Sequence, residues 1–313
     1  MNLSLPKISI ITPSYNQGKF LEQTILSVIN QNYPNLEYVI MDGGSSDDSV
    51  DIIKKHFNKI TYWESKKDNG QADAINKGLN KCTGDIICWI NSDDVLMEGA
   101  LENIAQKFKS INEPAIVSGN YRTIDVNGNV VWQPKSENDS LYAGSYSALD
   151  LLKCWRNTLP QPSTFWNRAA FEKLRLLNPN YHFAMDLEYW LRAISLGIKI
   201  YKTNSIYSSF RIHPESKSST LEVKLKEELK SLQKTYLQTK AEKFFYTISF
   251  FIWFSSESKI NKAIGLVNNG NIRGSLLEII KSIVYFPVNI IFKARNYFYY
   301  FKLLAKFTLN LNK

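Results

Sequence analysis

The sequence has few residues that could form disulfide bonds or bind zinc. Its 313 residues include three cysteines and three histidines. No Cys-x-x-Cys pair occurs among Cys82, Cys88 and Cys154, and Cys88 lies in an apolar run that is typical of a buried strand. These features exclude a disulfide framework and a clustered zinc site. They favour a reducing compartment.

Hydrophobic runs long enough to cross a bilayer are also missing. Residues 244–254 and 283–292 are mostly apolar. Each run is about half as long as the roughly 20 residues that a membrane span requires. The N-terminal residues lack a charged region followed by a long apolar stretch, so we expect no signal peptide. The chain is therefore predicted to be cytoplasmic.

Excess positive charge is absent until the last third of the chain. The formal net charge is +9, yet residues 1–223 contain 23 Lys and Arg against 24 Asp and Glu. Residues 224–313 contain 15 Lys and Arg against 5 Asp and Glu. Lysines and aromatic residues flank both apolar runs of this last region, which is typical of helices in a membrane interface. A helical cap on the preceding domain and a contact in a homo-oligomer are the alternatives.

The same region argues against a nucleic-acid partner. Its aromatic residues form apolar clusters and do not alternate with the charges, as they do where bases stack on a protein. We therefore predict two regions. Residues 1–220 form one folded domain, and residues 221–313 form a basic, aromatic-rich helical region that associates peripherally with the inner face of the cell membrane.

The first half of the chain alternates between strand and helix patterns. Apolar runs end at Ile11, Met41, Trp63 and Ile90, and a helical pattern follows each run. Such alternation predicts an α/β, Rossmann-like fold with a mostly parallel sheet and helices on both faces.

The second half is less regular. Asn127 and Gly128 lie between two β-rich arms, which predicts a hairpin. Residues 181–195 predict an amphipathic helix, and residues 198–201 and 205–211 predict two further strands.

Polar residues collect after three of the predicted strands, at 12–16, 42–48 and 91–94. Because the carboxyl ends of parallel strands meet at one edge of an α/β sheet, we expect these stretches to form a ligand site. Asp93 and Asp94 repel each other unless a cation neutralises them. Such carboxylates suit Mg²⁺ or Mn²⁺ together with the oxygens of a diphosphate. A helix cap is the alternative for this pair.

Two other polar stretches have both a functional and a structural interpretation. Asp42 precedes two glycines and either accepts a hydrogen bond from a nucleobase or ribose or belongs only to a turn. Residues 65–78 either form a solvated, capped loop or place Asp68, Gln71 and Asp73 over a polar ligand such as a sugar.

The order of four motifs resembles the family 2 glycosyltransferases, which have the nucleotide-diphospho-sugar transferase (GT-A) fold. The motifs are TPSYN at 12–16, DGGSSD at 42–47, DNGQADAINKG at 68–78 and WINSDD at 89–94. Each motif alone is a weak signal, but the set in this order is specific. The resemblance covers about residues 7 to 218.

The resemblance implies that Pro13, Tyr15 and Asp42 hold the nucleoside and that residues 91–94 replace the family's Asp-x-Asp metal motif. Asn91 stands where many members have the first aspartate. Metal contact therefore falls to Asp94, and ribose or metal contact falls to Asp93. The donor-binding candidates are Pro13, Tyr15, Asn16, Asp42, Gly43, Asp68, Gln71, Asp73, Asp93 and Arg211.

The predicted helix near residue 186 supplies candidates for the catalytic base. Asp186 and Trp190 stand at i and i+4 and so share one helix face. An amphipathic helix with ordinary surface acids is the alternative. The family carries its base at this point in an acidic motif, often Glu-Asp. Met185 replaces the glutamate here, so the resemblance implies Asp186 as the base and Glu188 as the second choice.

The segment 210–219 resembles the family's Arg-x-His segment. It implies His213 as a metal or diphosphate contact, with Arg211 beside the phosphates. The alternatives are a structural histidine and a mobile polar loop. Gln161 and Trp190 are the candidates for the acceptor pocket.

These features predict an inverting, divalent-metal-dependent glycosyltransferase of class EC 2.4. Its donor is a nucleotide-diphospho-sugar, expected to be a UDP-sugar. Its acceptor is a hydroxyl group of a saccharide, expected to be lipid-linked, in cell-surface polysaccharide synthesis. A nucleotidyltransferase or sugar-nucleotide hydrolase is the alternative function. That alternative requires a Gly-rich loop with a phosphate-binding Lys or Arg after the first strand, where this chain has residues 15–19.

Overall fold

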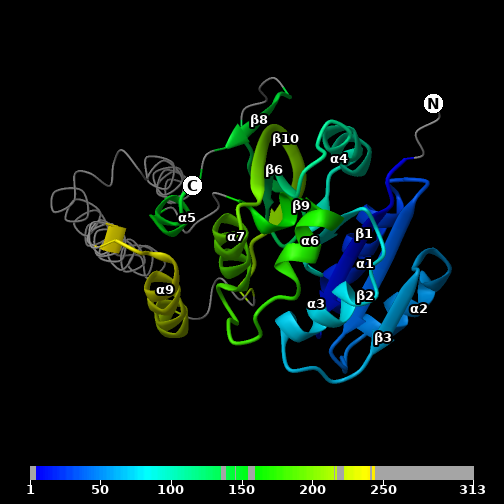
Figure 1. The fold of residues 1–313 in the computed structure, drawn as a ribbon. Helices are drawn as coiled ribbons and strands as arrows, with labels where there is room; N and C mark the ends of the chain where they lie inside the picture. The colour runs from blue at the N-terminus through cyan, green and yellow to red at the C-terminus, as the bar shows by residue number, and fades with distance from the viewer. Residues whose placement is uncertain are drawn as a thin grey trace, which may run out of the picture. The chain divides into compact units, whose positions relative to one another are not determined.

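The computed structural model (Figure 1) describes residues 5–134, 139–144, 146–153, 159–214, 216, 222–239 and 242–243. The chain divides into two compact units, Met1–Leu237 and Gln238–Lys313. Both apolar runs of the predicted membrane region lie outside the described residues. Among the residues that are described, no helix is long and apolar enough to cross a bilayer. The domain boundary near residue 220 stays a prediction.

One sheet, of ten strands among the described residues, runs through the first unit. Its order is β3 (Tyr62–Ser65), β2 (Leu36–Asp42), β1 (Ile8–Ser14), β4 (Ile86–Trp89), β9 (Thr164–Asn167), β6 (Ala115–Ile124), β10 (Lys199–Arg211) and β5 (Val95–Leu96). Two short strands lie off this path: β7 (Val130–Trp132) pairs with β6, and β8 (Leu141–Gly144) pairs with β10.

The sheet is mixed, which corrects the prediction of a mostly parallel one. Strands β3, β2, β1 and β4 are parallel, with Ile8 opposite both Leu36 and Ile86. Strand β9 then lies antiparallel between β4 and β6. An antiparallel strand needs no crossover helix. The alternation of strands and helices along the chain therefore does not by itself give the direction of a strand.

Strand β1 is buried on both faces, as its apolar run predicts. Ile8 and Ile10 join the core on one face. Ile11 points to the other face, where a Cβ atom on Gly78 would lie 2.5 Å from its Cγ2 atom. The helix that carries Gly78 packs so closely on β1 that no side chain fits at position 78.

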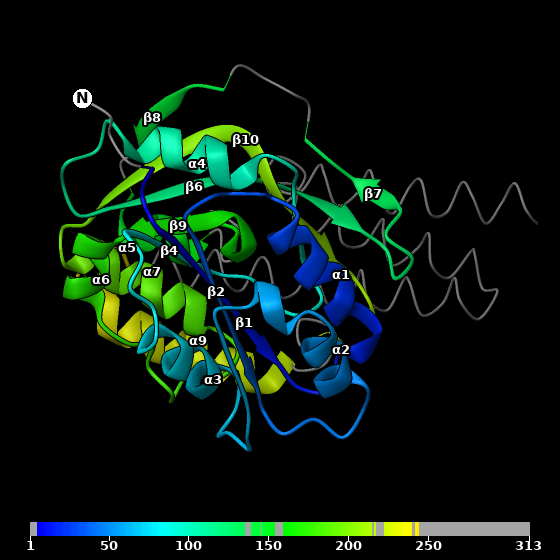
Figure 2. The ribbon, with the colours of Figure 1, turned by 90° about the vertical axis from the view of Figure 1, so that its right-hand side faces the viewer.

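Helices cover both faces of the sheet, as predicted. α1 (Gly18–Ile29), α2 (Ser49–Lys55) and α4 (Ala100–Phe108) share a core with one face. α3 (Gln71–Leu79), α6 (Arg168–Leu174) and α7 (Met185–Ser195) lie on the other, as Figure 2 shows for β1 and β2 between α1 and α3. α9 (Glu222–Tyr236) and α5 (Ala148–Lys153) contact each other and α7. Short 3-10 helices occur at η1 (Phe57–Lys59) and η2 (Gln161–Ser163).

The predicted hairpin is confirmed. β6 and β7 pair antiparallel with Thr123 opposite Trp132, and Gly128 in the turn has a φ angle of 85°. The two strands predicted at 198–201 and 205–211 form the single strand β10 instead. Its pairing with β6 shifts register between Lys202 and Ser208, which breaks the apolar pattern without ending the strand.

Candidate active site

Strands β1, β2 and β3 end side by side at one edge of the sheet. Ser14 is opposite Asp42, and Asp42 is opposite Ser65. The Gly43 amide donates to the Ser14 carbonyl at 2.8 Å, which extends the pairing one residue beyond the strands. Strand β4 pairs with the other side of β1. The three polar stretches therefore leave the sheet from a common edge, called the ligand edge below.

The loops after β1 and β2 are bonded to each other. The Asn16 amide donates to Ser45 Oγ at 2.8 Å, and Asn16 Oδ1 accepts from the Ser46 amide at 2.9 Å. Asn16 has a φ angle of 50°, a conformation that asparagine tolerates better than most residues. Asn16 therefore joins the two loops, and its predicted donor contact stays a prediction.

Asp42 is buried and organises the turn that follows it. Its Oδ2 accepts hydrogen bonds from the Gly44 and Ser45 amides at 3.1 and 2.9 Å and from the Ser65 hydroxyl at 2.6 Å. Its Oδ1 accepts from the Ser45 hydroxyl at 2.5 Å. Both oxygens have protein partners, which matches the turn alternative. A direct contact with a nucleoside stays a prediction.

Tyr15, Gly43 and Asp68 meet at the ligand edge. A Cβ atom on Gly43 would lie 2.7 Å from Asp68 Oδ2 and 3.3 Å from Tyr15 Cδ2. The Tyr15 side chain is 62% exposed. An exposed aromatic ring can stack on a nucleobase, and a neighbouring carboxylate can accept hydrogen bonds from it. Pro13 lies beside this group at the end of β1, opposite Met41.

Asp73 lies in the first turn of α3 and bonds back to the loop before the helix. Its Oδ2 accepts from the Asn69 amide at 3.0 Å and pairs with Lys77 at 3.0 Å. The hydrogen bond from the Asn69 amide, assisted by Lys77, lowers the pKa of Asp73. These contacts tie the loop to the helix, whereas the expected side-chain cap at Asn69 or Asp68 is not formed. The predicted contact of Asp73 with the donor stays a prediction.

Three side-chain amides form a chain across the ligand edge. Gln71 Nε2 donates to Asn91 Oδ1 at 2.8 Å, and Asn91 Nδ2 donates to Gln161 Oε1 at 3.1 Å. Gln161 Nε2 donates in turn to the Trp89 carbonyl at 2.7 Å. The structure thus brings together residues predicted separately as donor and acceptor contacts. An aspartate at 91 could not donate to Gln161, which gives a physical reason for asparagine at this position.

Asp94 is fully buried behind this chain. Its Oδ1 accepts from the Arg211 amide at 3.0 Å, and its Oδ2 lies 3.5 Å from Asn91 Nδ2. Burial and the adjacent charge of Asp93 raise the pKa of Asp94 well above its ordinary range. These contacts hold the end of β10 against the β4–β5 loop. They favour a structural role for Asp94 over the predicted metal contact.

Asp93 is more accessible than Asp94, and it pairs with the buried His213. Asp93 Oδ2 lies 3.1 Å from His213 Nε2, and the Asp93 side chain is 22% exposed. The His213 ring is buried against Phe20, with the ring centroids 4.7 Å apart. One carboxylate oxygen and one imidazole nitrogen at this separation fit a divalent cation such as Mn²⁺ or Mg²⁺, with diphosphate oxygens as further ligands. Within the described ranges, no group of three or more His, Cys, Asp or Glu side chains is arranged to hold an ion.

Arg211 is buried below this pair and bonds to protein atoms. Its Nε donates to the Asp93 carbonyl at 2.8 Å, its Nη1 donates to the Asp125 carbonyl at 3.0 Å, and its Nη2 donates to Gln23 Oε1. The guanidinium also stacks on the Phe20 ring at 4.9 Å. This arrangement favours a role in shaping the β4–β5 loop over the predicted phosphate contact.

Thr24 supports the same loop and was missed by the sequence analysis. Its hydroxyl lies 2.9 Å from the Ser92 carbonyl and 2.7 Å from the Asp94 carbonyl. The available signal was a polar residue on the apolar face of α1, between Leu21 and Ile25.

Asp186 lies in the first turn of α7, which begins near the start of α3. His182, just before α7, has its Nδ1 atom 4.0 Å from a Cβ atom built on Gly70. Asn76 of α3 exchanges two hydrogen bonds with the backbone of Leu177, at 2.9 and 2.8 Å. The start of α7 is therefore held against α3 on the side of the ligand edge.

Trp190, one turn after Asp186, belongs to the core. Its ring stacks on Trp89 with centroids 5.9 Å apart and an interplanar angle of 9°. Trp166 and Tyr189 make edge contacts with Trp190. Only 2% of Trp190 is exposed, which favours a structural role over the predicted acceptor contact.

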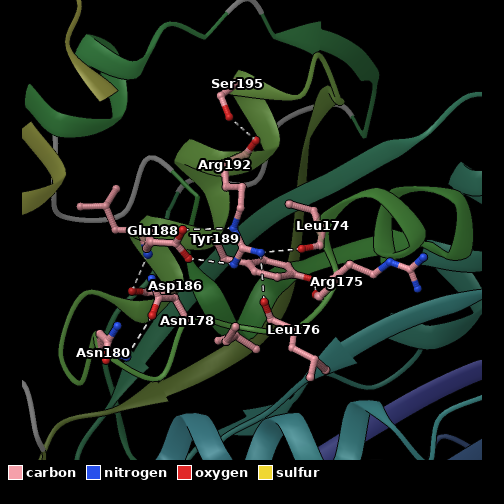
Figure 3. A network of polar contacts seen from close by, with 12 residues as sticks. Leu174, Arg175, Leu176, Asn178, Asn180, Asp186, Glu188, Tyr189, Arg192 and Ser195 are labelled. Carbon is pink, nitrogen blue, oxygen red and sulfur yellow. Dashed lines mark hydrogen bonds and ion pairs between the residues drawn. The ribbon is translucent and has the colours of Figure 1, made fainter. Parts of the chain in front are cut away.

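Glu188 forms a two-pronged ion pair with Arg192 (Figure 3). Arg192 Nε lies 3.0 Å from Glu188 Oε1, and Arg192 Nη2 lies 2.9 Å from Oε2. Arg192 Nη1 also donates to the carbonyls of Leu174, the last residue of α6, and Leu176. The Tyr236 hydroxyl of α9 donates to Glu188 Oε1 at 2.9 Å. Both carboxylate oxygens of a buried Glu188 are thus in use, which favours a structural role over the second-choice role as base.

The mixed sheet and its flanking helices have a GT-A-like arrangement. Staphylococcus aureus TarS, solved in complex with UDP-GlcNAc, matches with a TM-score of 0.60 and 15% identity. The match covers 87% of this chain and 90% of that chain. This likeness shows the fold.

The family follows from the sequence comparison. Residues 9–175 match the family model Glycosyl transferase family 2, so the chain belongs to this family of glycosyltransferases. Asp186, Arg211 and His213 lie beyond the matched residues.

Two curated relatives add detail. A Haemophilus influenzae protein described as an uncharacterized glycosyltransferase is 37% identical over 132 residues, which cover 41% of this chain and 52% of the relative. A Campylobacter jejuni protein named GalNAc(5)-diNAcBac-PP-undecaprenol beta-1,3-glucosyltransferase is 26% identical over 215 residues. The match covers 67% of this chain and 65% of the Campylobacter protein. This chain thus spans about half the length of the Haemophilus relative.

Proposed function

We propose that this chain transfers a sugar from a UDP-sugar to a hydroxyl group of a saccharide acceptor, with inversion at the anomeric carbon. The observation that carries the proposal is the pairing of Asp93 with His213 at the edge where the β1, β2 and β4 loops converge. TarS has been solved in complex with UDP and with UDP-GlcNAc, which supports a uridine donor.

The donor would lie along the ligand edge. Tyr15 and Asp68 would contact the base, because they flank the backbone at Gly43. Asp93 and His213 would hold Mn²⁺ or Mg²⁺, which supplies positive charge for the diphosphate. The amide chain through Gln71 would present polar groups to the sugar.

Asp186 is the proposed base, since Glu188 is engaged with Arg192. Its carboxylate takes the proton of the acceptor hydroxyl as that oxygen forms a bond to the anomeric carbon. The bond from this carbon to the diphosphate oxygen breaks on the opposite face, and UDP leaves with the electron pair. One displacement inverts the anomeric configuration, so no covalent nucleophile is required.

A thermal-shift screen of UDP-, GDP- and dTDP-sugars, each with and without Mn²⁺, tests the proposal. We expect one UDP-sugar to stabilise the chain, and to do so more with Mn²⁺. Stabilisation by bound ligand grows with the logarithm of its concentration over Kd, which separates binding from a nonspecific shift. No shift with any donor from a folded sample would refute the proposal.

The name of the Campylobacter relative includes an undecaprenol-linked substrate. It supports a lipid-linked acceptor, and with it a role in cell-surface polysaccharide synthesis at the inner face of the membrane. The basic region 221–313 would provide the membrane contact. Deleting residues 238–313 should abolish co-sedimentation with anionic vesicles, while the parent chain should sediment less as salt rises. Equal sedimentation of both proteins would contradict this part of the proposal.

A further inference from the structure

We propose that Glu228 of α9 is a positioning residue for sugar transfer, because it holds the start of α7 and therefore the location of Asp186. The inference rests on the proposed function of Asp186 as the base. Glu228 belongs to the stretch that the charge pattern groups with the basic C-terminal region, yet it lies within the first compact unit.

Glu228 accepts hydrogen bonds from three consecutive backbone amides before α7. Its Oε1 accepts from the His182 amide at 2.8 Å. Its Oε2 accepts from the Phe183 amide at 2.9 Å and from the Ala184 amide at 2.8 Å. A carboxylate that accepts several amides at once fixes the backbone conformation of that segment.

The segment before α7 has no cap of its own. Ala184 occupies the N-cap position, and its methyl side chain makes no capping hydrogen bond. A helix start leaves backbone N–H groups without intrahelical partners, and negative charge there is stabilising. Glu228, from a different helix, accepts from the N-cap amide of Ala184 and from the two amides before it.

Two more contacts from α9 act on the same elements. Ser231 Oγ lies 3.1 Å from the Tyr181 hydroxyl, and Tyr236 donates to Glu188 within α7. Leu229 and Leu232 are buried beside them. α9 is thus packed against α7 by its apolar side chains and aligned by its polar ones. Glu228 bonds to Ala184 and Tyr236 bonds to Glu188, two residues before and two residues after Asp186.

Glu228 and the proposed donor contacts act on different elements, so a change at Glu228 should affect kcat and not donor binding. The proposed donor contacts lie on the loops after β1, β2 and β4, whereas Glu228 acts on α7. A base must lie within hydrogen-bond reach of the acceptor hydroxyl. A misplacement of about 1 Å can cost on the order of a hundredfold in rate.

The test compares Glu228→Gln with Glu227→Gln, which changes an exposed neighbour on the same helix. Kd is measured for UDP with Mn²⁺, and kcat and KM for release of UDP from the UDP-sugar selected in the donor screen. Amide hydrogen exchange is followed across residues 181–187. Ser231→Ala, a milder change on the same side of α9, covers the case in which Glu228→Gln fails to fold.

We expect Glu228→Gln to lower kcat by about ten- to a hundredfold. Its Kd for UDP should change less than about twofold, and exchange at His182, Phe183 and Ala184 should accelerate. Ser231→Ala should lower kcat less, in the same direction, and Glu227→Gln should match the parent. An unchanged kcat in Glu228→Gln, or a parallel loss of UDP binding, overturns the inference. A parent chain that releases no UDP from any UDP-sugar refutes the proposed function, and the inference with it.

Discussion

Asp93 and His213 are 120 positions apart in the chain, and their Oδ2 and Nε2 atoms lie 3.1 Å apart. Asp93 comes from the loop after β4, and His213 follows the end of β10. The Arg211 amide donates to Asp94 Oδ1 at 3.0 Å, and this hydrogen bond holds the two segments together. The pair is therefore built by one aspartate that holds the backbone and another that faces outward.

His213→Ala should remove the Mn²⁺-dependent part of UDP-sugar binding, because it deletes one of two proposed ion contacts. We expect the Kd measured with Mn²⁺ to rise at least about tenfold, while the Kd measured with EDTA stays the same. Isothermal titration in both conditions measures this. His56→Ala, at a histidine paired with Glu22 on the surface of α1, is the control. A Kd that rises equally in both conditions would show that His213 only supports the fold.

Asp186→Asn should lower activity, whereas Glu188→Gln should lower stability. Asp186→Asn removes the proposed base, so kcat should fall about 10²-fold or more with little change in thermal stability. Glu188→Gln breaks a buried ion pair with Arg192 and should lower the free energy of unfolding by about 3 kcal/mol. Initial rates and urea unfolding of both variants distinguish the roles. A stable but inactive Glu188→Gln would reassign the base.

Asn91→Asp should destabilise the ligand edge, although it restores the residue common in the family. The carboxylate would face Gln161 Oε1 without a proton to donate and would add charge beside the buried Asp94. We expect the free energy of unfolding at pH 7 to fall by about 1–3 kcal/mol. Asn58→Asp, at an exposed position in η1, is the matched control for urea unfolding. Equal stability of the two variants would contradict the amide-chain geometry.

Glu37 should make the free energy of unfolding depend on pH in the acidic range. Burial alone would raise its pKa, but Lys7, Ser9 and Thr83 outweigh burial and hold the pKa of Glu37 at about 2. A folded-state pKa below the unfolded value stabilises the fold above the unfolded pKa. That contribution is lost as the pH falls from about 4.5 towards 2.

Glu37→Gln should therefore lower the free energy of unfolding at pH 7 by about 1–3 kcal/mol. The difference from the parent should shrink as the pH falls through that window. Urea unfolding at several pH values, with the exposed Glu98→Gln as control, measures the effect. A difference that stays constant with pH would rule out the ionised contribution.

The sequence predicted the parallel half of the fold well because each strand there is followed by a helix with one apolar face. The motifs after β1, β2 and β4 reach a common edge for the same reason. The antiparallel strand β9 was not predicted. Its four residues, 164–167, have no alternation of apolar and polar side chains that would indicate the direction of the strand. Register shifts likewise hid the continuity of β10.

It was harder to predict what each site residue does than to predict which residues lie together. Asp93, Asp94 and His213 were expected together and do lie together, yet which carboxylate faces outward depends on which one bonds to the Arg211 amide. The burial of Arg211 depends on contacts with Gln23 and Asp125, far away in the sequence. Glu228 had no motif at all, since one glutamate on a helix with four lysines and three glutamates carries no local signal.

The hydrogen bonds between Glu228 and the residues before α7 limit where the C-terminal part of this chain can be replaced by that of a relative. A chimera that joins this chain's residues 1–220 to another protein's C-terminal part would keep the catalytic motifs and discard the partner of the helix that presents Asp186. A graft made after Leu237 would keep both halves of that contact, because the first compact unit ends there. Such a graft point lies seventeen residues beyond the predicted domain boundary at residue 220.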